Sequence, residues 1–290
     1  MFEGSLVALV TPFKNGRLDE EGLRRNVRFQ IENGTQGLVP CGTTGESPTL
    51  SEEEESRVIE IVVEEARGKI PVVSGTGTNS TRKTIEKTQR AKKMGSDGAL
   101  LVSPYYNKPT QEGLFRHFRE VAENVDLPLI LYNIPGRTAV NIEPETIERL
   151  SQHKNIVGVK EASGSLDQVS RIVNLCGDRI TVLSGDDSLT LPMMAVGAKG
   201  VISVLANIVP KDLREMIHAF LKGELVRARE IHHRLFSLFK VMFIETNPIP
   251  IKSAMDLLGM PAGEVRLPLV PLSNGNLQKL KKALEEYGLL

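Results

Sequence analysis

Short apolar runs alternate with longer amphipathic segments along roughly the first 220 residues of the chain. A short apolar run bounded by turn residues is typical of a buried strand, and apolar residues three and four apart are typical of a helix with one buried face. The pattern predicts eight strands, at residues 6–10, 37–40, 70–74, 99–102, 127–132, 156–160, 180–184 and 200–204. A predicted helix follows each strand, at residues 19–33, 51–66, 80–94, 111–125, 143–151, 165–175, 188–196 and 210–221.

Local signals mark the ends of several predicted helices. Ser51 with Glu54 three residues later forms a capping box at a helix start. Gly34 and Gly95 stand where helices should end, because glycine readily adopts the left-handed conformation found there. Eight uninterrupted strand–helix units predict a parallel α/β fold. They favour a closed (β/α)8 TIM barrel over an open doubly wound sheet.

The strand pattern stops near the end of the eighth unit. Residues 224–244, 249–258 and 276–287 have helical spacing, and no low-complexity linker precedes them. We therefore expect residues 1–223 to form the barrel. Residues 224–290 should form a C-terminal helical extension that packs on it.

Composition narrows the class of protein. Lys plus Arg and Asp plus Glu both number 36, so the chain lacks the basic excess typical of nucleic-acid or anionic membrane binding. Cys41 and Cys176 lie far apart in the sequence, which argues against a disulfide framework and favours the reducing cytoplasm. The N-terminus does not resemble a signal peptide, and no apolar run reaches membrane-spanning length.

Lys160 stands at the end of a buried apolar run, where barrel enzymes have their active sites. Most lysines at a strand end extend their amine into solvent. In a pocket, however, burial disfavours the ammonium, so the neutral and nucleophilic amine is favoured. The loops that follow the other strands decide between these two interpretations.

Three of the four tyrosines, Tyr105, Tyr106 and Tyr132, fall in the loops after the fourth and fifth strands. A phenol beside an amine can supply the proton that a carbinolamine needs to lose water. Lys160 with Tyr132 therefore predicts Schiff-base chemistry. Arg137, in the same loop as Tyr132, can bind a carboxylate through two parallel hydrogen bonds.

Other chemistries have weaker support. Asp186 and Asp187 have no histidine or third carboxylate at a matching strand end, which argues against a metal site. The five histidines lie away from these loops, which argues against a histidine triad or a zinc mechanism. Cys41 has no histidine near it in the sequence, so we expect a small apolar filler there.

Taken together, the loops resemble the dihydrodipicolinate synthase family of pyruvate-dependent class I aldolases. Each motif alone is weak, but the ordered set covers essentially the whole chain at the family's spacing. The motifs are GSLVALVTPF at residues 4–13, GTTGES at 42–47, PYYNKP at 104–109, YNIPGRT at 132–138, GVKEA at 158–162, SGDD at 184–187, GVISV at 200–204 and ETNPIP at 245–250.

The resemblance implies a homotetrameric lyase of lysine (diaminopimelate) biosynthesis that uses pyruvate and L-aspartate-4-semialdehyde and needs neither a metal nor an organic cofactor. Lys160 would form a Schiff base with pyruvate. Tyr132, Thr43 and Tyr106 would form a proton relay, with Tyr106 reaching in from a neighbouring subunit. The substrate-binding positions would be Thr44, Arg137, Ile202 and Gly185.

In lysine-sensitive relatives a cleft between subunits binds lysine as an inhibitor. Lys83 stands where sensitive members often carry a glutamate. A cation there would repel the cationic ligand by about 1 kcal/mol or more, so we expect weakened inhibition. Alternatively, Lys83 pairs with Glu86 or with the neighbours of Lys87 on the helix surface and never faces the cleft. The matching positions of the cleft are Ser47, Pro48, Glu52, Glu55, Asn79, Lys83 and Tyr105.

Two rival interpretations remain at this point. Another Schiff-base aldolase, such as N-acetylneuraminate lyase or a keto-deoxy-sugar-acid aldolase, would keep Lys160 and Tyr132 but act on a polyhydroxylated substrate. Arg137 argues against it, because a guanidinium suits a small charged aldehyde acid. A non-catalytic barrel that binds a small carboxylate would have no need of a nucleophilic lysine.

Overall fold

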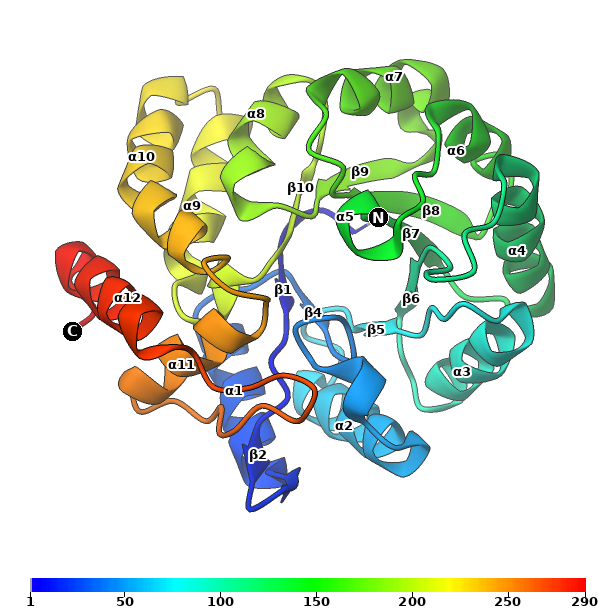
Figure 1. Cartoon of the computed structure of the whole chain (residues 1–290). Coiled ribbons are helices and arrows are strands. Elements are labelled where there is room, and N and C mark those ends of the chain that lie inside the picture. The colour runs from blue at the N-terminus through cyan, green and yellow to red at the C-terminus, as the bar shows by residue number, and fades with distance from the viewer. Residues whose placement is uncertain (1) are drawn as a thin grey trace.

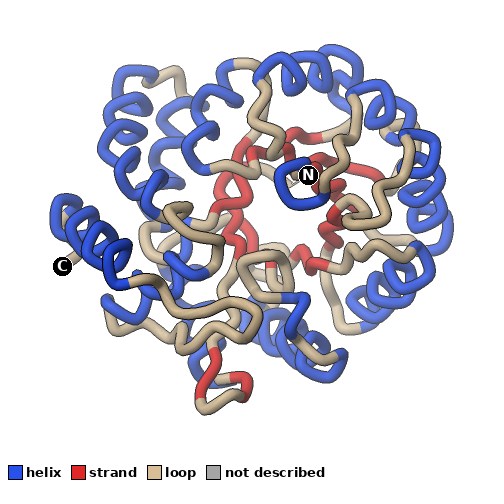
Figure 2. Tube along the Cα trace, viewed as in Figure 1, coloured by secondary structure: helices blue, strands red, loops and turns tan. Residues whose placement is uncertain are grey.

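A computed structural model describes residues 2–290 and contains one sheet of eight parallel strands. A parallel bridge between Leu38 and Val72 joins the two ends of this sheet. The strands therefore close into a barrel, which is the inner ring in Figure 2. Their spatial order is β4 (Gly37–Val39), β1 (Gly4–Ala8), β10 (Gly200–Ser203), β9 (Thr181–Ser184), β8 (Ile156–Glu161), β7 (Leu129–Asn133), β6 (Gly98–Val102) and β5 (Val73–Gly75).

Helices surround this ring of strands (Figure 1). The TIM-barrel prediction is confirmed, and the open doubly wound sheet is excluded because the sheet closes. The predicted capping box is also present, with Ser51 and Glu54 bonded to each other's backbone N–H. The helices that follow the strands are α1 (Glu20–Glu32), α2 (Glu52–Ala66), α3 (Thr81–Lys93), α4 (Gln111–Asn124), α6 (Pro144–Leu150), α7 (Leu166–Cys176), α8 (Thr190–Ala195) and α9 (Pro210–Leu221).

Two short elements lie outside the predicted pattern. A hairpin of β2 (Phe13–Lys14) and β3 (Arg17–Leu18) interrupts the first strand–helix connection, and its turn contains Gly16 with φ +75°. The helix α5 (Pro135–Thr138) follows β7. Strands of two residues and a helix of one turn are too short to produce a hydrophobic period, which is why the sequence pattern does not reveal them.

The C-terminal helices α10 (Leu225–Val241), α11 (Ile249–Leu257) and α12 (Asn274–Tyr287) lie along one side of the barrel (Figure 1). Leu235 and Phe239 of α10 are buried in the same apolar cluster as Leu213 of α9. The extension therefore shares a core with the barrel. The division between residues 223 and 224 stays a prediction.

A buried ion pair connects the C-terminal extension to the loop that follows β4. Lys252 of α11 places its Nζ 2.7 Å from the carboxylate of Glu46, which follows β4, and both side chains are almost fully buried. The same ammonium donates to the carbonyl of Thr11 at 3.2 Å. The Glu46 carboxylate also accepts the backbone N–H of Arg266 at 3.0 Å. The Lys252 ammonium and the Glu46 carboxylate therefore each form at least one hydrogen bond in addition to the ion pair.

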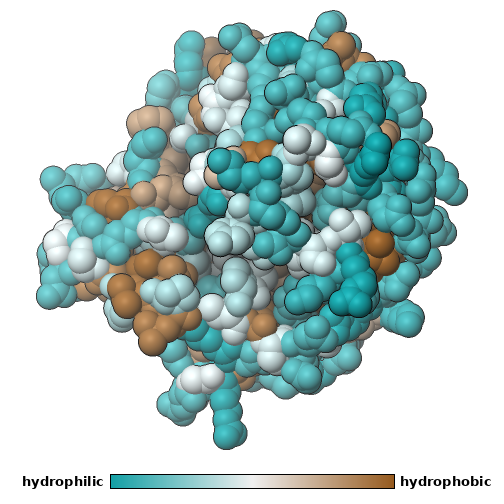
Figure 3. Space-filling view, turned by 45° about the vertical axis from the view of Figure 1, so that its right-hand side comes forward, coloured by the Kyte–Doolittle hydropathy of each residue, from teal (hydrophilic) through white to brown (hydrophobic). Residues whose placement is uncertain are grey.

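The face of the molecule in Figure 3 is mostly hydrophilic, with apolar side chains gathered in a few patches. Among residues 2–290, no helix is both long and apolar enough to cross a membrane.

Removing the Lys252 ammonium should destabilise the protein strongly, because the Glu46 carboxylate would remain buried without its partner. We expect Lys252→Met to lower the free energy of unfolding by about 3–5 kcal/mol. Urea unfolding followed by circular dichroism at a fixed protein concentration measures this loss. Lys282→Met is the control, since the pair with Glu286 is exposed and is worth less than about 1 kcal/mol. A loss as small as the control's would contradict this role of the ion pair.

Candidate active site

Lys160 lies on β8, beside Tyr132 of β7. The two residues are partners in the register of the parallel strands, so their side chains leave the sheet on the same face. Lys160 is only 6% exposed, and its Nζ lies 4.3 Å from the centre of the Tyr132 ring. The structure thus brings together the predicted nucleophile and the predicted proton donor.

Burial lowers the pKa of the Lys160 amine to about 8, because the charged ammonium is poorly solvated there. The carboxylate of Asp187 acts in the opposite direction, and the Arg137 guanidinium lowers the pKa further. With such a pKa roughly a tenth of the amine is neutral at neutral pH, against well under a thousandth for an ordinary lysine. Burial therefore favours the neutral form of the amine, which a nucleophilic role would require.

Tyr132 differs from Lys160 in its response to burial. Its pKa rises to about 12, chiefly because the phenolate would be desolvated, while Arg137 and a hydrogen bond from Thr43 act to lower it. The phenol consequently keeps its proton at neutral pH. It can donate that proton to a leaving hydroxyl beside Lys160.

Gly185, which follows β9, approaches the lysine side chain closely. A Cβ at this position would lie 3.1 Å from Cε of Lys160 and 2.7 Å from Cβ of Ala162. A larger residue would therefore push the lysine out of place. Ile202 of β10 is buried in the same apolar cluster as Tyr132, inside the barrel.

The loop after β4 presents Thr43 and Thr44. Thr44 is buried, and its Oγ1 accepts a hydrogen bond from Nδ2 of Asn247 at 3.0 Å. The loop is also held from the β1 side, since Oγ1 of Thr11 donates to the carbonyl of Gly45 at 2.8 Å. These contacts hold the turn against the C-terminal extension and against the segment that follows β1.

Thr43 and Arg137 line one cavity of about 220 Å³, whose lining does not include Lys160 or Tyr132. Arg137 reaches this cavity from α5, and its Nη2 donates to the carbonyl of Asn247 at 3.3 Å. Tyr106 does not join the others. It is 91% exposed, in a loop where its φ is +73°.

Three comparisons place the chain among known proteins. A model of the dihydrodipicolinate synthetase family matches residues 1–287. The chain is 60% identical to the 4-hydroxy-tetrahydrodipicolinate synthase of Geotalea uraniireducens (strain Rf4), over the whole of both chains. The chain belongs to the dihydrodipicolinate synthetase family. The resemblance deduced from the ordered motifs is confirmed.

Solved structures of family members agree with the fold. The dihydrodipicolinate synthase from Aquifex aeolicus is 54% identical and matches with a TM-score of 0.98, over 99% of each chain. The enzyme from Cyanidioschyzon merolae, solved with lysine bound, is 42% identical. It also matches with a TM-score of 0.98, over 100% of this chain and 99% of that one.

Two of the acidic residues expected at the family's lysine cleft form ion pairs with basic residues of this chain. Glu55 pairs with Lys87 at 2.6 Å and Glu52 pairs with Arg90 at 2.8 Å. Lys83 is exposed, and no ion pair among the described residues includes it. The alternative pairing with Glu86 is wrong in this structure, because Arg82 pairs with Glu86 instead.

Ser47, Pro48 and Tyr105, also expected at the cleft, line the same cavity as Arg137. Asn79 donates from Nδ2 to the carbonyl of Tyr105 at 3.2 Å. These four expected residues therefore lie close to one another, at or beside the cavity that Arg137 lines.

Asp187 has a structural role that the sequence analysis did not recognise. Its Oδ2 accepts the backbone N–H groups of Val204 and Leu205, both at 3.0 Å. Burial raises the pKa of this carboxyl to about 6, so it is mostly ionised at neutral pH. Across residues 2–290, no group of three or more His, Cys, Asp or Glu side chains is arranged to hold a metal.

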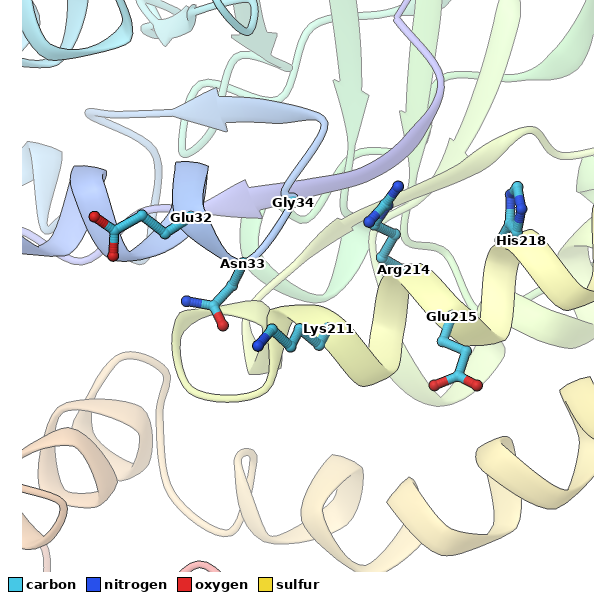
Figure 4. A pocket seen from close by; sticks show the side chains of 7 residues that line it. All are labelled: Glu32, Asn33, Gly34, Lys211, Arg214, Glu215 and His218. Carbon is cyan, nitrogen blue, oxygen red and sulfur yellow. The ribbon is translucent and has the colours of Figure 1, made fainter.

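A second cavity, of about 400 Å³, contains none of the predicted site residues (Figure 4). Its charged side chains come from the end of α1 and from one side of α9. They carry both signs, with Glu32 and Glu215 opposed by Lys211 and Arg214. The predicted site residues Thr43 and Arg137 line the cavity of about 220 Å³ instead.

Replacing Asp187 by Asn should lower the pKa of Lys160 below its value of about 8. The change removes a negative charge that stabilises the ammonium, and an amide oxygen can still accept the two backbone bonds. The pH dependence of imine formation with pyruvate should move to lower pH. Asp186→Asn is the control, because the pKa of Lys160 shows no effect of Asp186. An unchanged profile, or one moved upward, would refute this electrostatic role.

Proposed function

We propose that this chain condenses pyruvate with L-aspartate-4-semialdehyde to give 4-hydroxy-tetrahydrodipicolinate, a step of lysine synthesis through diaminopimelate. The observation that carries this proposal is the buried Lys160 amine beside the Tyr132 phenol. The activity is that of a lyase, as the relatives' names imply. It takes place in the cytoplasm, in keeping with the two free cysteines.

The reaction begins with the neutral amine of Lys160. It attacks C2 of pyruvate, and the carbinolamine loses its hydroxyl as water with a proton from Tyr132, leaving an iminium ion and the Tyr132 phenolate. Transfer of a proton from C3 of the iminium ion to this phenolate gives a neutral enamine. The enamine carbon attacks the aldehyde carbon of the semialdehyde, forming the new C–C bond. The amino group of the adduct then attacks the imine carbon and displaces Lys160, which closes the ring.

The other residues have roles in binding and proton transfer. Thr43 and Tyr106 continue the proton relay from Tyr132. The hydroxyl and backbone N–H of Thr44 bind the pyruvate carboxylate. Arg137 binds the carboxylate of the semialdehyde, which a guanidinium at the mouth of the cavity is well suited to do.

Two further residues define the shape of the pyruvate site. The carbonyl of Ile202 faces the bound pyruvate. Gly185 leaves room for the Lys160 side chain and its imine, since a Cβ there would crowd Cε of Lys160.

The working form of the enzyme is a homotetramer in which Tyr106 completes the site of a neighbouring subunit. Two observations support this assembly. Tyr106 is a large aromatic residue left 91% exposed in the single chain, and aromatic residues are enriched at subunit interfaces. Several apolar side chains on α9 and α10 are also exposed, namely Leu221, Leu225, Val226 and Phe236.

Borohydride reduction in the presence of pyruvate should add the reduced pyruvyl group to Lys160, as read by peptide mass spectrometry. Label on another lysine, or no label at all, would contradict the assignment of Lys160 as the nucleophile.

Arg137→Ala is the control variant. Pyruvate should still label Lys160 in this variant, whereas kcat/KM for the semialdehyde should fall roughly 10- to 150-fold through loss of a charge-assisted contact. An equal loss in imine formation and in the reaction with the semialdehyde would show that Arg137 supports the site structurally.

Mixing the inactive variants Tyr106→Phe and Lys160→Ala under subunit exchange should restore part of the activity. A mixed pair contains one site with both residues intact, because each subunit supplies what its neighbour lacks. Each variant exchanged only with itself is the control and should stay inactive. If exchange is confirmed by native mass spectrometry and no activity returns, Tyr106 does not act across an interface.

L-Lysine should inhibit this enzyme only weakly. Lys83 adds a cation, and the ion pairs of Glu55 with Lys87 and Glu52 with Arg90 leave less negative charge for the ligand's ammonium groups. Initial rates titrated with L-lysine measure the inhibition, and Lys83→Glu should strengthen it. Strong inhibition of the parent at submillimolar lysine would contradict this expectation.

A further inference from the structure

Asn247 connects the two loops that carry the substrate-binding residues. It lies between α10 and α11, and only 5% of its surface is exposed. Its side-chain Nδ2 donates to Oγ1 of Thr44 at 3.0 Å, in a buried setting. Its backbone carbonyl accepts Nη2 of Arg137 at 3.3 Å. One residue of the C-terminal extension therefore contacts the loop after β4 and the loop after β7.

The direction of the bond to Thr44 matters for the chemistry. A threonine hydroxyl has one proton to donate and lone pairs that accept. When Asn247 donates to this hydroxyl, the proton of Thr44 is free to point elsewhere. A bound carboxylate accepts hydrogen bonds and has none to give. The bond from Asn247 therefore leaves the Thr44 proton available for donation to an anion.

We propose that Asn247 is a positioning residue, which holds the Thr44 hydroxyl as a hydrogen-bond donor to the pyruvate carboxylate. This inference rests on the proposed function, and it makes the C-terminal extension part of the pyruvate site. Asn247 acts through Thr44 and does not itself take part in bond making.

The ion pair described above gives this arrangement its rigidity. Glu46 stands two residues after Thr44, and Lys252 stands five residues after Asn247. Their bond of 2.7 Å joins the same two segments that the Asn247–Thr44 bond joins. Nζ of Lys252 also bonds the carbonyl of Glu264 at 2.6 Å. Two parallel connections therefore fix the loop after β4 against the extension.

The test measures how the rate of borohydride labelling of Lys160 depends on pyruvate concentration in the full-length enzyme. Asn247→Ala should raise the half-saturating pyruvate concentration roughly 2- to 12-fold, the value of one hydrogen bond. Asn247→Asp keeps the size of the side chain, but its carboxylate can only accept hydrogen bonds. The Thr44 hydroxyl should then donate to this carboxylate instead of to pyruvate, so the half-saturating pyruvate concentration should rise more than in Asn247→Ala. Asn276→Ala is the control, because Asn276 bonds Glu245 in the same extension, and it should leave the concentration unchanged.

A double-mutant cycle separates positioning from a general structural role. Thr44→Val removes the hydroxyl, so adding Asn247→Ala to it should cause no further rise in the half-saturating concentration. Independent, multiplicative losses would overturn the proposal, as would an Asn247→Asp variant that binds pyruvate as well as the parent. If Asn247→Ala does not fold, Asn247→Asp enters the same cycle.

The labelling experiment distinguishes a failure of the proposed function from a failure of the role proposed for Asn247. A parent enzyme that gives no label on Lys160 overturns the Schiff-base reaction itself. A labelled parent whose pyruvate dependence is insensitive to Asn247→Ala overturns only the role of Asn247.

Discussion

The burial of one amine, that of Lys160, is the constraint on which the site depends. A closed barrel surrounds β8 with strands on both sides, so the lysine at its end has little access to water. Burial then favours the neutral amine over the ammonium and the protonated phenol over the phenolate. The same physical effect thus favours a neutral amine at Lys160 and a protonated phenol at Tyr132, which are the forms that their proposed roles require. Asp187 limits the shift of the lysine, so its amine remains able to accept a proton.

A second constraint is the connection of the barrel loops to the C-terminal extension. The turn that carries Thr43 and Thr44 is held to the extension by the Lys252–Glu46 ion pair and by the bond from Asn247. Precise placement of hydroxyls matters because a small misplacement of a binding group reduces the rate. The extension therefore supports the turn that carries Thr43 and Thr44, and it also shares a core with α9.

The sequence predicts the eight strand–helix units because each buried strand and each amphipathic helix has a recognisable spacing of apolar residues within its own segment. It also predicts Lys160, Tyr132 and Arg137, since strand ends of a barrel converge. It does not predict the partners of Thr44 and Glu46, which lie 203 and 206 residues away in the chain. Such contacts have no local pattern. Nor does the sequence predict the structural role of Asp187, because its bonds to the backbone N–H groups of residues 204 and 205 form only in the folded turn.

The central claim is that burial prepares the Lys160 amine for attack, and the pH dependence of its reactivity in the free enzyme tests this most directly. Trace labelling with acetic anhydride at a series of pH values, followed by peptide mass spectrometry, gives the rate at which this one amine reacts. The account predicts half-maximal reactivity near pH 8, the depressed pKa of Lys160. Half-maximal reactivity near 10.5, the ordinary pKa of a lysine, would contradict it.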